Sequence, residues 1–235
     1  MLVEGIRAIG GALTAGVDVK FALISERLEA TPTGTGLAST LRSMDVDVTE
    51  VTMAELDDLA DTEHPQGALL ICREPRAELS GLVGTGEGRY LVLDGVQDPG
   101  NAGTLARTAA ALSIDGLVFL DGSVDPWSPK TVRASAGSLF QVGTVRASAV
   151  DAIAAFAGAN VPLWVAEADG QNVEEAEATD TFALVLGNEG AGPRVALRDA
   201  STHSVAVPMS GSLNSLNVAV AGSILLYELT KESRS

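Results

Sequence analysis

Runs of apolar residues separated by polar turns recur along the chain, and their spacing predicts alternating helices and strands. In the first third, apolar residues at helical spacing predict a helix at 2–16 that stops at Gly16. The runs that follow predict strands at 19–24, 46–51 and 67–72, a loop at 30–36, and helices at 37–43 and from Met53. Alternation of this kind is typical of a small α/β unit.

The second part of the chain repeats this alternation more strongly. Its predicted strands are nearly continuous apolar runs, which are typical of a parallel sheet buried on both faces. These strands lie at 90–94, 116–120, 161–166, 182–187 and 203–207, with helices at 102–112, 129–137, 148–157 and 215–230. The sequence therefore predicts an α/β fold in two units of different size.

A glycine-rich stretch at 74–89 separates the two parts and has little periodicity. We therefore expect a small domain at 1–75, a linker at 76–89 that acts as a hinge, and a larger domain at 90–235. The letters GTGEG within the linker superficially resemble a dinucleotide-binding loop, but they precede a strand instead of following one. A Rossmann nucleotide enzyme is therefore not favoured.

Composition and charge restrict the possible functions. Of the 235 residues 46% are hydrophobic, which is enough for a sizeable core. The formal net charge of −16 argues against a protein that coats nucleic acid indiscriminately, because such binding relies on Lys and Arg. Residues 151–180 hold seven acids and no base, whereas 91–150 hold five acids and four bases. Two interpretations fit this distribution. The acidic body could carry a locally positive cleft, or, more simply, the acids at 151–180 serve only solubility.

Several classes of protein are not favoured. No run reaches the ~18 apolar residues of a membrane helix, and Glu4 and Arg7 interrupt the place where a signal peptide has its apolar core. The single cysteine, Cys72, excludes an internal disulfide framework. His64 and His203 lie far apart and match no metal-ligand spacing. We expect a soluble, cytoplasmic protein with no metal and no membrane partner.

Three segments of the larger domain carry the candidate chemistry. In the first, a strand ends in LDGVQDPGNAGTLAR, where we expect Asn101 to cap a helix. Arg107 would then lie near the N-terminal part of this helix, where anions are favoured. A capped helix with an ordinary surface arginine is the simpler interpretation.

The second and third segments follow in the order LVLGNEGAGP and VPMSGSLNSLNVA. In the second, a buried strand runs into a turn with three glycines, which let backbone approach a ligand, and one carboxylate, Glu189. In the third, small polar residues lead into a long apolar helix, and the simpler interpretation of Ser215 or Asn214 is an N-cap of this helix. Asn217 is unusual just inside such a helix unless its amide has a partner. Each segment alone also fits an ordinary strand–helix connection.

Together the three segments resemble the signature motifs of the SpoU (TrmH-like) RNA 2′-O-ribose methyltransferases of the SPOUT superfamily. The family pattern is Asn-x-Gly-x-x-x-Arg, then Gly-x-Glu-Gly, then Pro-Met…Ser-Leu-Asn-Val-Ala, and all three occur in this order. The N-terminal part resembles the family's substrate domain, which is similar to ribosomal protein L30, from VEG at 3–5 to TEHPQG at 62–67. Family members usually carry a basic stretch before the position of Leu2, where this sequence starts at once.

The resemblance implies an α/β sheet whose C-terminal segment is threaded into a deep trefoil knot. It also implies a homodimer through the knot region, which would use the apolar face of the last helix (Val218, Ile224, Leu225). S-adenosylmethionine would bind in the knot, largely to backbone, because an adenine ring needs apolar walls and few hydrogen bonds. The cofactor-binding residues that the resemblance implies are Leu186, Gly187, Val207, Met209 and Leu216.

The implied reaction is methyl transfer to a ribose 2′-hydroxyl, which requires alignment but no metal. The resemblance places Arg107 at the substrate ribose and phosphate. Because arginine stays protonated in proteins, binding the phosphate and stabilising oxyanion charge suits it better than acting as a base. The other implied catalytic residues, which orient Arg107 and the ribose, are Asn101, Glu189, Ser215 and Asn217, with Glu189 holding the guanidinium.

The substrate expected from an L30-like domain is structured RNA, with 23S ribosomal RNA favoured and transfer RNA as the alternative. Residues 1–75 are expected to select this RNA through a local face made of Arg7, Lys20, Arg27 and Arg42. If they do not, specificity is expected to rest on Lys130, Arg133 and Arg146. A non-catalytic RNA-binding protein is a different class, but it is expected to have lost Arg107 or Asn101, and both are present.

Overall fold

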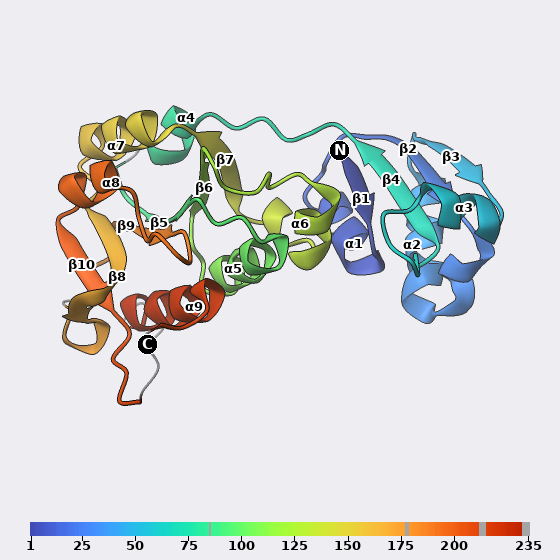
Figure 1. Cartoon of the computed structure of the whole chain (residues 1–235). Helices are drawn as coiled ribbons and strands as arrows, with labels where there is room; N and C mark the ends of the chain where they lie inside the picture. Colours follow the sequence, from blue (N-terminus) through green and yellow to red (C-terminus); the bar gives the residue numbers. More distant parts are fainter. Residues whose placement is uncertain (85, 177–178, 212–214, 232–235) are drawn as a thin grey trace.

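The computed structural model describes the chain apart from residues 85, 177–178, 212–214 and 232–235. A four-stranded sheet lies near the N-terminus, and a six-stranded sheet organises the remainder (Figure 1). An extended connection joins the two parts across one side of the molecule. The α/β class predicted from the alternation is confirmed.

The N-terminal sheet consists of β1 (Leu2–Glu4), β2 (Val19–Ile24), β3 (Asp47–Glu50) and β4 (Ala68–Cys72). Its order is β1-β4-β2-β3, in which β2 and β3 are parallel and β4 is antiparallel to both its neighbours. The helices of this part are α1 (Ile6–Thr14), α2 (Pro32–Ser43) and α3 (Met53–Leu59), with a 3₁₀ turn η1 (Glu26–Ala30).

The predicted helix at 2–16 was wrong in its first turn. Leu2–Glu4 form β1 instead, which pairs antiparallel with β4 at the end of the chain's N-terminal part. Gly5 separates this strand from α1 with a φ of 95°, which only glycine adopts readily. A long-range strand pair therefore outweighed the local helical spacing.

The predicted loop at 30–36 was also wrong, because α2 begins at Pro32. Thr31 caps this helix by accepting a hydrogen bond from the Gly34 N–H, and a proline suits the first turn. A Cβ on Gly34 would lie 1.7 Å from the Leu28 carbonyl oxygen, so glycine here serves close packing instead of a turn.

The six-stranded sheet consists of β5 (Arg89–Asp94), β6 (Gly116–Leu120), β7 (Gly143–Ala147), β8 (Leu163–Asn172), β9 (Phe182–Gly187) and β10 (His203–Ala206). Its order is β10-β8-β9-β5-β6-β7, and all of these neighbours pair in parallel, as predicted. The helices are α4 (Leu79–Val83), α5 (Pro99–Ala111), α6 (Pro129–Ala134), α7 (Ala149–Gly158), α8 (Val195–Ala200) and α9 (Val218–Leu229), with 3₁₀ turns η2 (Ser138–Phe140) and η3 (Val173–Glu175).

Three elements of this part were not predicted from the sequence. β7 is an edge strand in which buried Thr144 and Val145 lie between exposed Gly143 and Arg146, so it has no apolar run to mark it. α4 lies within the predicted linker, and α8 is only six residues long. α5 begins at Pro99 and α9 at Val218, which shifts both helix starts by three residues from the expected ones.

Alternate side chains of the central strands face opposite layers of helices. Leu91 and Leu93 of β5 belong to the core beneath α5 and α9, whereas Val92 packs in the core beneath α4, α7 and α8 (Figure 1). Both faces of the sheet are therefore covered. From β5 the chain proceeds outward through β6 and β7, then crosses to β8, so the order reverses between β5 and β9. Such a switch point is where parallel sheets bind ligands, at the carboxyl ends of the strands.

The two parts of the chain share one apolar core, which includes Val3 and Ile9 from the first and Leu139 from the second. α1 touches the turn after α6 so closely that a Cβ on Gly11 would lie 2.8 Å from the Gly137 Cα. The two parts are thus packed against each other, and the hinge at 76–89 stays a prediction.

Candidate active site

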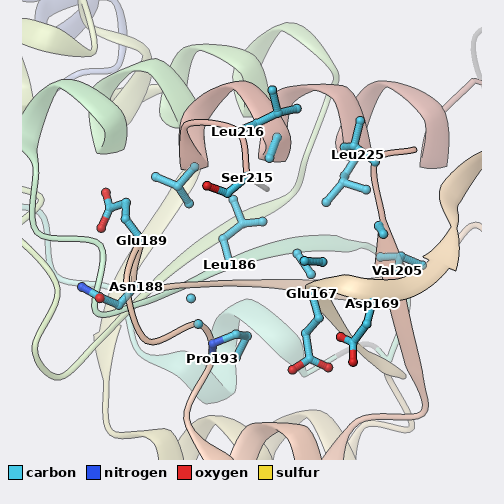
Figure 2. A pocket seen from close by; sticks show the side chains of 18 of the residues that line it. Glu167, Asp169, Leu186, Asn188, Glu189, Pro193, Val205, Ser215, Leu216 and Leu225 are labelled. Carbon is cyan, nitrogen blue, oxygen red and sulfur yellow. The ribbon is translucent and has the colours of Figure 1, made fainter. Parts of the chain in front are cut away.

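A pocket of about 350 Å³ opens at the carboxyl ends of β8 and β9. Leu186 lies at its centre in Figure 2, with Glu189 and Ser215 on one side and Glu167 and Asp169 on the other. Apolar side chains make its floor and walls: Leu186, Val205, Val207, Leu216, Val218 and Leu225. The pocket thus combines an apolar interior with a polar rim, at the carboxyl edge of the sheet.

The turn after β9 forms one wall and folds back tightly on itself. A Cβ on Gly187 would lie 2.0 Å from the Pro193 nitrogen, so only glycine allows the two ends of the turn to approach. Asn188 closes the turn, since its Oδ1 accepts hydrogen bonds from the N–H groups of Gly190 (3.0 Å) and Ala191 (3.2 Å). Its Nδ2 donates to the Gly95 carbonyl at 3.0 Å, which joins the turn to the end of β5.

A buried ion pair anchors the far end of this turn. Asp94, whose side chain is 4% exposed, accepts hydrogen bonds from the Arg194 backbone N–H (2.7 Å) and Nε (2.6 Å). Arg194 Nη2 also donates to the Asp121 carbonyl at 2.7 Å. Because Arg194 directly follows Pro193, this pair fixes the pocket wall against β5.

Asp94→Asn is expected to lower the free energy of unfolding by about 1–3 kcal/mol, because an amide nitrogen would face the donors of Arg194. The Arg194 side chain is 37% exposed and can still reach water, which limits the loss. Urea unfolding checks this. Asp180→Asn is the control: it removes a carboxylate that is 94% exposed and paired with Arg89, so its effect should stay below about 1 kcal/mol. Equal losses would show that Asp94 is an ordinary surface partner.

A chain of side-chain hydrogen bonds joins the three predicted motifs at the mouth of the pocket. Asn101 Nδ2 donates to Glu189 Oε1 at 2.8 Å, and Asn217 Nδ2 donates to Asn101 Oδ1 at 3.0 Å. Asn217 is the N-cap of α9, since its Oδ1 accepts from the Ala219 and Val220 N–H groups. The Asn217 side-chain amide, which was expected to need a partner, therefore has three.

The expected cap of α5 was wrong by three residues. Asp98 caps α5 by accepting from the Asn101 N–H at 2.8 Å, which leaves the Asn101 side chain available to Glu189. Ser215 precedes the true cap of α9 and is exposed on the pocket rim, while Asn214 lies outside the described residues.

The structure brings all five predicted cofactor residues, Leu186, Gly187, Val207, Met209 and Leu216, to the lining of this pocket. Arg107 does not lie there. It is exposed on α5, six residues beyond Asn101 and so about 9 Å along the helix, and it lines a separate groove. The expected contact of Glu189 with Arg107 was wrong: among the described residues, the Glu189 carboxylate pairs with Asn101 instead.

Sequence reasoning missed the residues that β8 contributes. Glu167 and Asp169 line the pocket, and Arg198 of α8 pairs with Glu167 at 2.6 Å. The available signal was that parallel strands bring their carboxyl ends to one edge, so acids that follow an apolar run belong near the Gly187 turn.

Two further findings concern the described part of the chain. Within it, no group of three or more His, Cys, Asp or Glu side chains is arranged to hold a metal ion. Likewise, none of its helices has the length and apolar character needed to span a bilayer.

Solved structures match the fold over its whole length. SpoU methyltransferase AviRb from Streptomyces viridochromogenes, in complex with the cofactor AdoMet, is similar with a TM-score of 0.85 and 28% identity, over 100% of this chain and 90% of that one. The fold is therefore that of a SpoU methyltransferase. The model of the SpoU rRNA Methylase family matches residues 88–227, and that of RNA 2′-O ribose methyltransferase substrate binding matches residues 2–78. The chain belongs to the SpoU rRNA methylase family.

Two relatives from bacteria are similar in sequence. One is the 23S rRNA (guanosine(2553)-2′-O)-methyltransferase RlmP of Bacillus subtilis, 37% identical over 73% of this chain and 67% of that protein. The other is the 23S rRNA (uridine(2479)-2′-O)-methyltransferase of Streptomyces viridochromogenes, 29% identical over 98% of this chain and 82% of that protein.

Proposed function

We propose that the protein transfers a methyl group from S-adenosylmethionine to a ribose 2′-hydroxyl of RNA, with 23S ribosomal RNA as the substrate. The main observation behind this proposal is the row of hydrogen-bonded side chains, Glu189, Asn101 and Asn217, at the mouth of an apolar pocket. Membership of the SpoU rRNA methylase family supports the activity. The names of the two relatives support 23S rRNA, and because they give different nucleotides, the position is left to experiment.

The pocket fits the proposed cofactor in size and chemistry. Its volume of about 350 Å³ lies in the ~300–1,000 Å³ range of small-molecule sites. Leu186, Val207 and Leu216 would hold the adenine ring, together with backbone of the Gly187 turn. Three acids of the lining, Glu167, Asp169 and Glu189, outnumber Arg198, which suits the positive sulfonium and ammonium groups. When bound, the cofactor supplies a methyl group already activated for transfer.

The chain's own residues would align the ribose and stabilise charge. The hydrogen bonds among Glu189, Asn101 and Asn217 fix these side chains before substrate arrives, which lowers the entropic cost of alignment. Ser215, exposed on the rim, would hydrogen-bond the ribose. We assign to Arg107 the neighbouring phosphate and stabilisation of the negative charge that develops on the 2′-oxygen as its proton passes to water.

The family resemblance further supports a trefoil knot near the pocket, RNA selection by residues 1–75 and chemistry in residues 90–235. It also supports a homodimer. On α9, Val220, Ile224 and Tyr227 are 49%, 37% and 56% exposed, an apolar stripe that a second copy would cover. Val218 and Leu225, expected on this face, are instead buried within the chain. Ile224→Glu should convert the dimer into a monomer in light scattering; a wild-type monomer would contradict the dimer.

Mapping of 2′-O-methyl groups tests the activity. Ribosomal and transfer RNA from cells with and without the protein are compared, and the purified protein is given unmodified transcripts of both with labelled cofactor. We expect one additional methylated position in 23S rRNA. Methylation of transfer RNA alone would reassign the substrate, and RNA binding without transfer would identify a non-catalytic RNA-binding protein.

A further inference from the structure

A second hollow, with a volume of about 610 Å³, is lined by residues of α1, α5 and α6. These helices lie where the two parts of the chain meet (Figure 1). We call this hollow the junction groove. Arg7, Arg107 and Arg133 line it, against a single acid, Glu4. On a chain of net charge −16, this lining is locally positive.

The acid of the junction groove is already satisfied. Glu4 is 2% exposed and accepts hydrogen bonds from the Asp61 N–H (3.1 Å) and the Thr62 hydroxyl. The Nη1 atom of Arg133 lies 3.7 Å from Glu4 Oε2 and 3.1 Å from Asp61 Oδ2, so Arg133 is paired with both acids. The charges left for a ligand are therefore those of Arg7 and Arg107.

Most other cations of the described chain are neutralised by acids. Ten are in ion pairs: Lys20, Arg27, Arg42, Arg73, Arg89, Arg133, Arg146, Arg194, Arg198 and Lys231. The predicted RNA-binding face of Arg7 with Lys20, Arg27 and Arg42 therefore loses three of its members to ion pairs. Among the residues that the structure places, four cations have no such partner: Arg7, Arg76, Arg107 and Lys130. Two of these four share the junction groove.

The position of Arg7 is fixed by close packing. Arg7 and Gly11 are one turn apart on α1, so they share a face of the helix. That face meets Gly137, whose added Cβ would lie 2.9 Å from the Arg7 carbonyl and 3.1 Å from the Gly11 Cα. The backbone at Arg7 is thereby held against the turn that follows α6.

Helix α5 connects the junction groove to the active site. Asn101 at its start belongs to the polar chain at the pocket mouth, and Arg107 lies about 9 Å further along. Exposed neutral groups that can hydrogen-bond RNA, Thr33, His64 and Gln66, line the other wall of the groove. An RNA strand that leaves the pocket along α5 would thus meet the free cations Arg107 and Arg7 and then polar side chains.

We propose that the junction groove binds the unpaired RNA segment next to the methylated nucleotide, with Arg7 and Arg107 contacting its phosphates. The proposal rests on the proposed function and adds Arg7 to the substrate-binding residues. Unpaired RNA is favoured because its phosphates and splayed bases can enter a groove of this volume, whereas duplexes are read across a wide surface. The small number of free cations predicts a shallow dependence of RNA affinity on salt.

Filter binding of an unmodified 23S rRNA transcript at about 50–200 mM salt tests this. Arg7→Ala is expected to weaken binding about tenfold and to reduce the slope of log affinity against log salt by about 0.7–0.9, the value of one lost phosphate contact. Arg76→Ala is the matched control, because Arg76 is an equally exposed free cation outside the groove. Its slope should equal that of the wild type. Urea unfolding of both variants verifies the fold.

An unchanged slope for Arg7→Ala, or an equal decrease for Arg76→Ala, would overturn the proposal. Methyl transfer by the wild type to the same transcript is measured in parallel. If the wild type transfers methyl groups but Arg7→Ala binds RNA like the wild type, only the RNA-binding role of the junction groove is refuted. If the wild type transfers no methyl group to any RNA, the proposed function is refuted.

Discussion

Arg107→Ala is expected to slow methyl transfer by at least about a hundredfold, or ~3 kcal/mol, because a charge that stabilises the transition state is lost. Cofactor affinity should stay nearly the same, since Arg107 lies outside the lining of the cofactor pocket. Single-turnover transfer of a labelled methyl group measures the rate, and calorimetry measures the affinity for the cofactor.

The lysine variant separates charge from shape. Arg107→Lys should restore little activity, because an ammonium group cannot form the planar two-pronged contact of a guanidinium with phosphate. Arg76→Ala, which removes a free cation elsewhere, is the control. A rate for Arg107→Lys within tenfold of the wild type would mean that only a point charge is needed.

Gly187→Ala is expected to weaken cofactor binding at least tenfold and to lower the free energy of unfolding by about 1–3 kcal/mol. The added Cβ would meet backbone of the same turn, 2.0 Å from the Pro193 nitrogen and 2.1 Å from the Gly192 carbonyl carbon. Because neither atom can move without opening the turn, the wall of the pocket must shift. Calorimetry with S-adenosylmethionine and urea unfolding measure the two effects.

The matched control for this substitution is Gly158→Ala, at the end of α7. A Cβ on Gly158 meets no atom within 4 Å, and its φ lies outside the left-handed region. Its cofactor affinity should equal that of the wild type, and its stability should change by less than about 0.5 kcal/mol. If Gly187→Ala behaves in the same way, the tight turn does not shape the cofactor site.

The sequence predicted what depends on strong local patterns. The apolar runs of the parallel strands and the glycines of the turn at Gly187 were sufficient to place the sheet and its carboxyl edge. It failed where distant contacts decide, as for Leu2–Glu4, which form a strand because β4 pairs with them. It also failed on side-chain partners: no spacing rule shows that Asp98, not Asn101, caps α5, or that Asn101 thereby becomes free to bond Glu189.

Neutralisation of most cations by acids has a consequence for how the protein searches for its target. Sliding along nucleic acid requires a broad positive surface that follows many phosphates, whereas this acidic chain offers few free cations. Collisions that bring RNA to other faces meet repulsion and separate quickly. We therefore expect target finding through many brief encounters in solution, with short residence on the wrong RNA. The abundance of acids thus sets the time lost on each incorrect encounter.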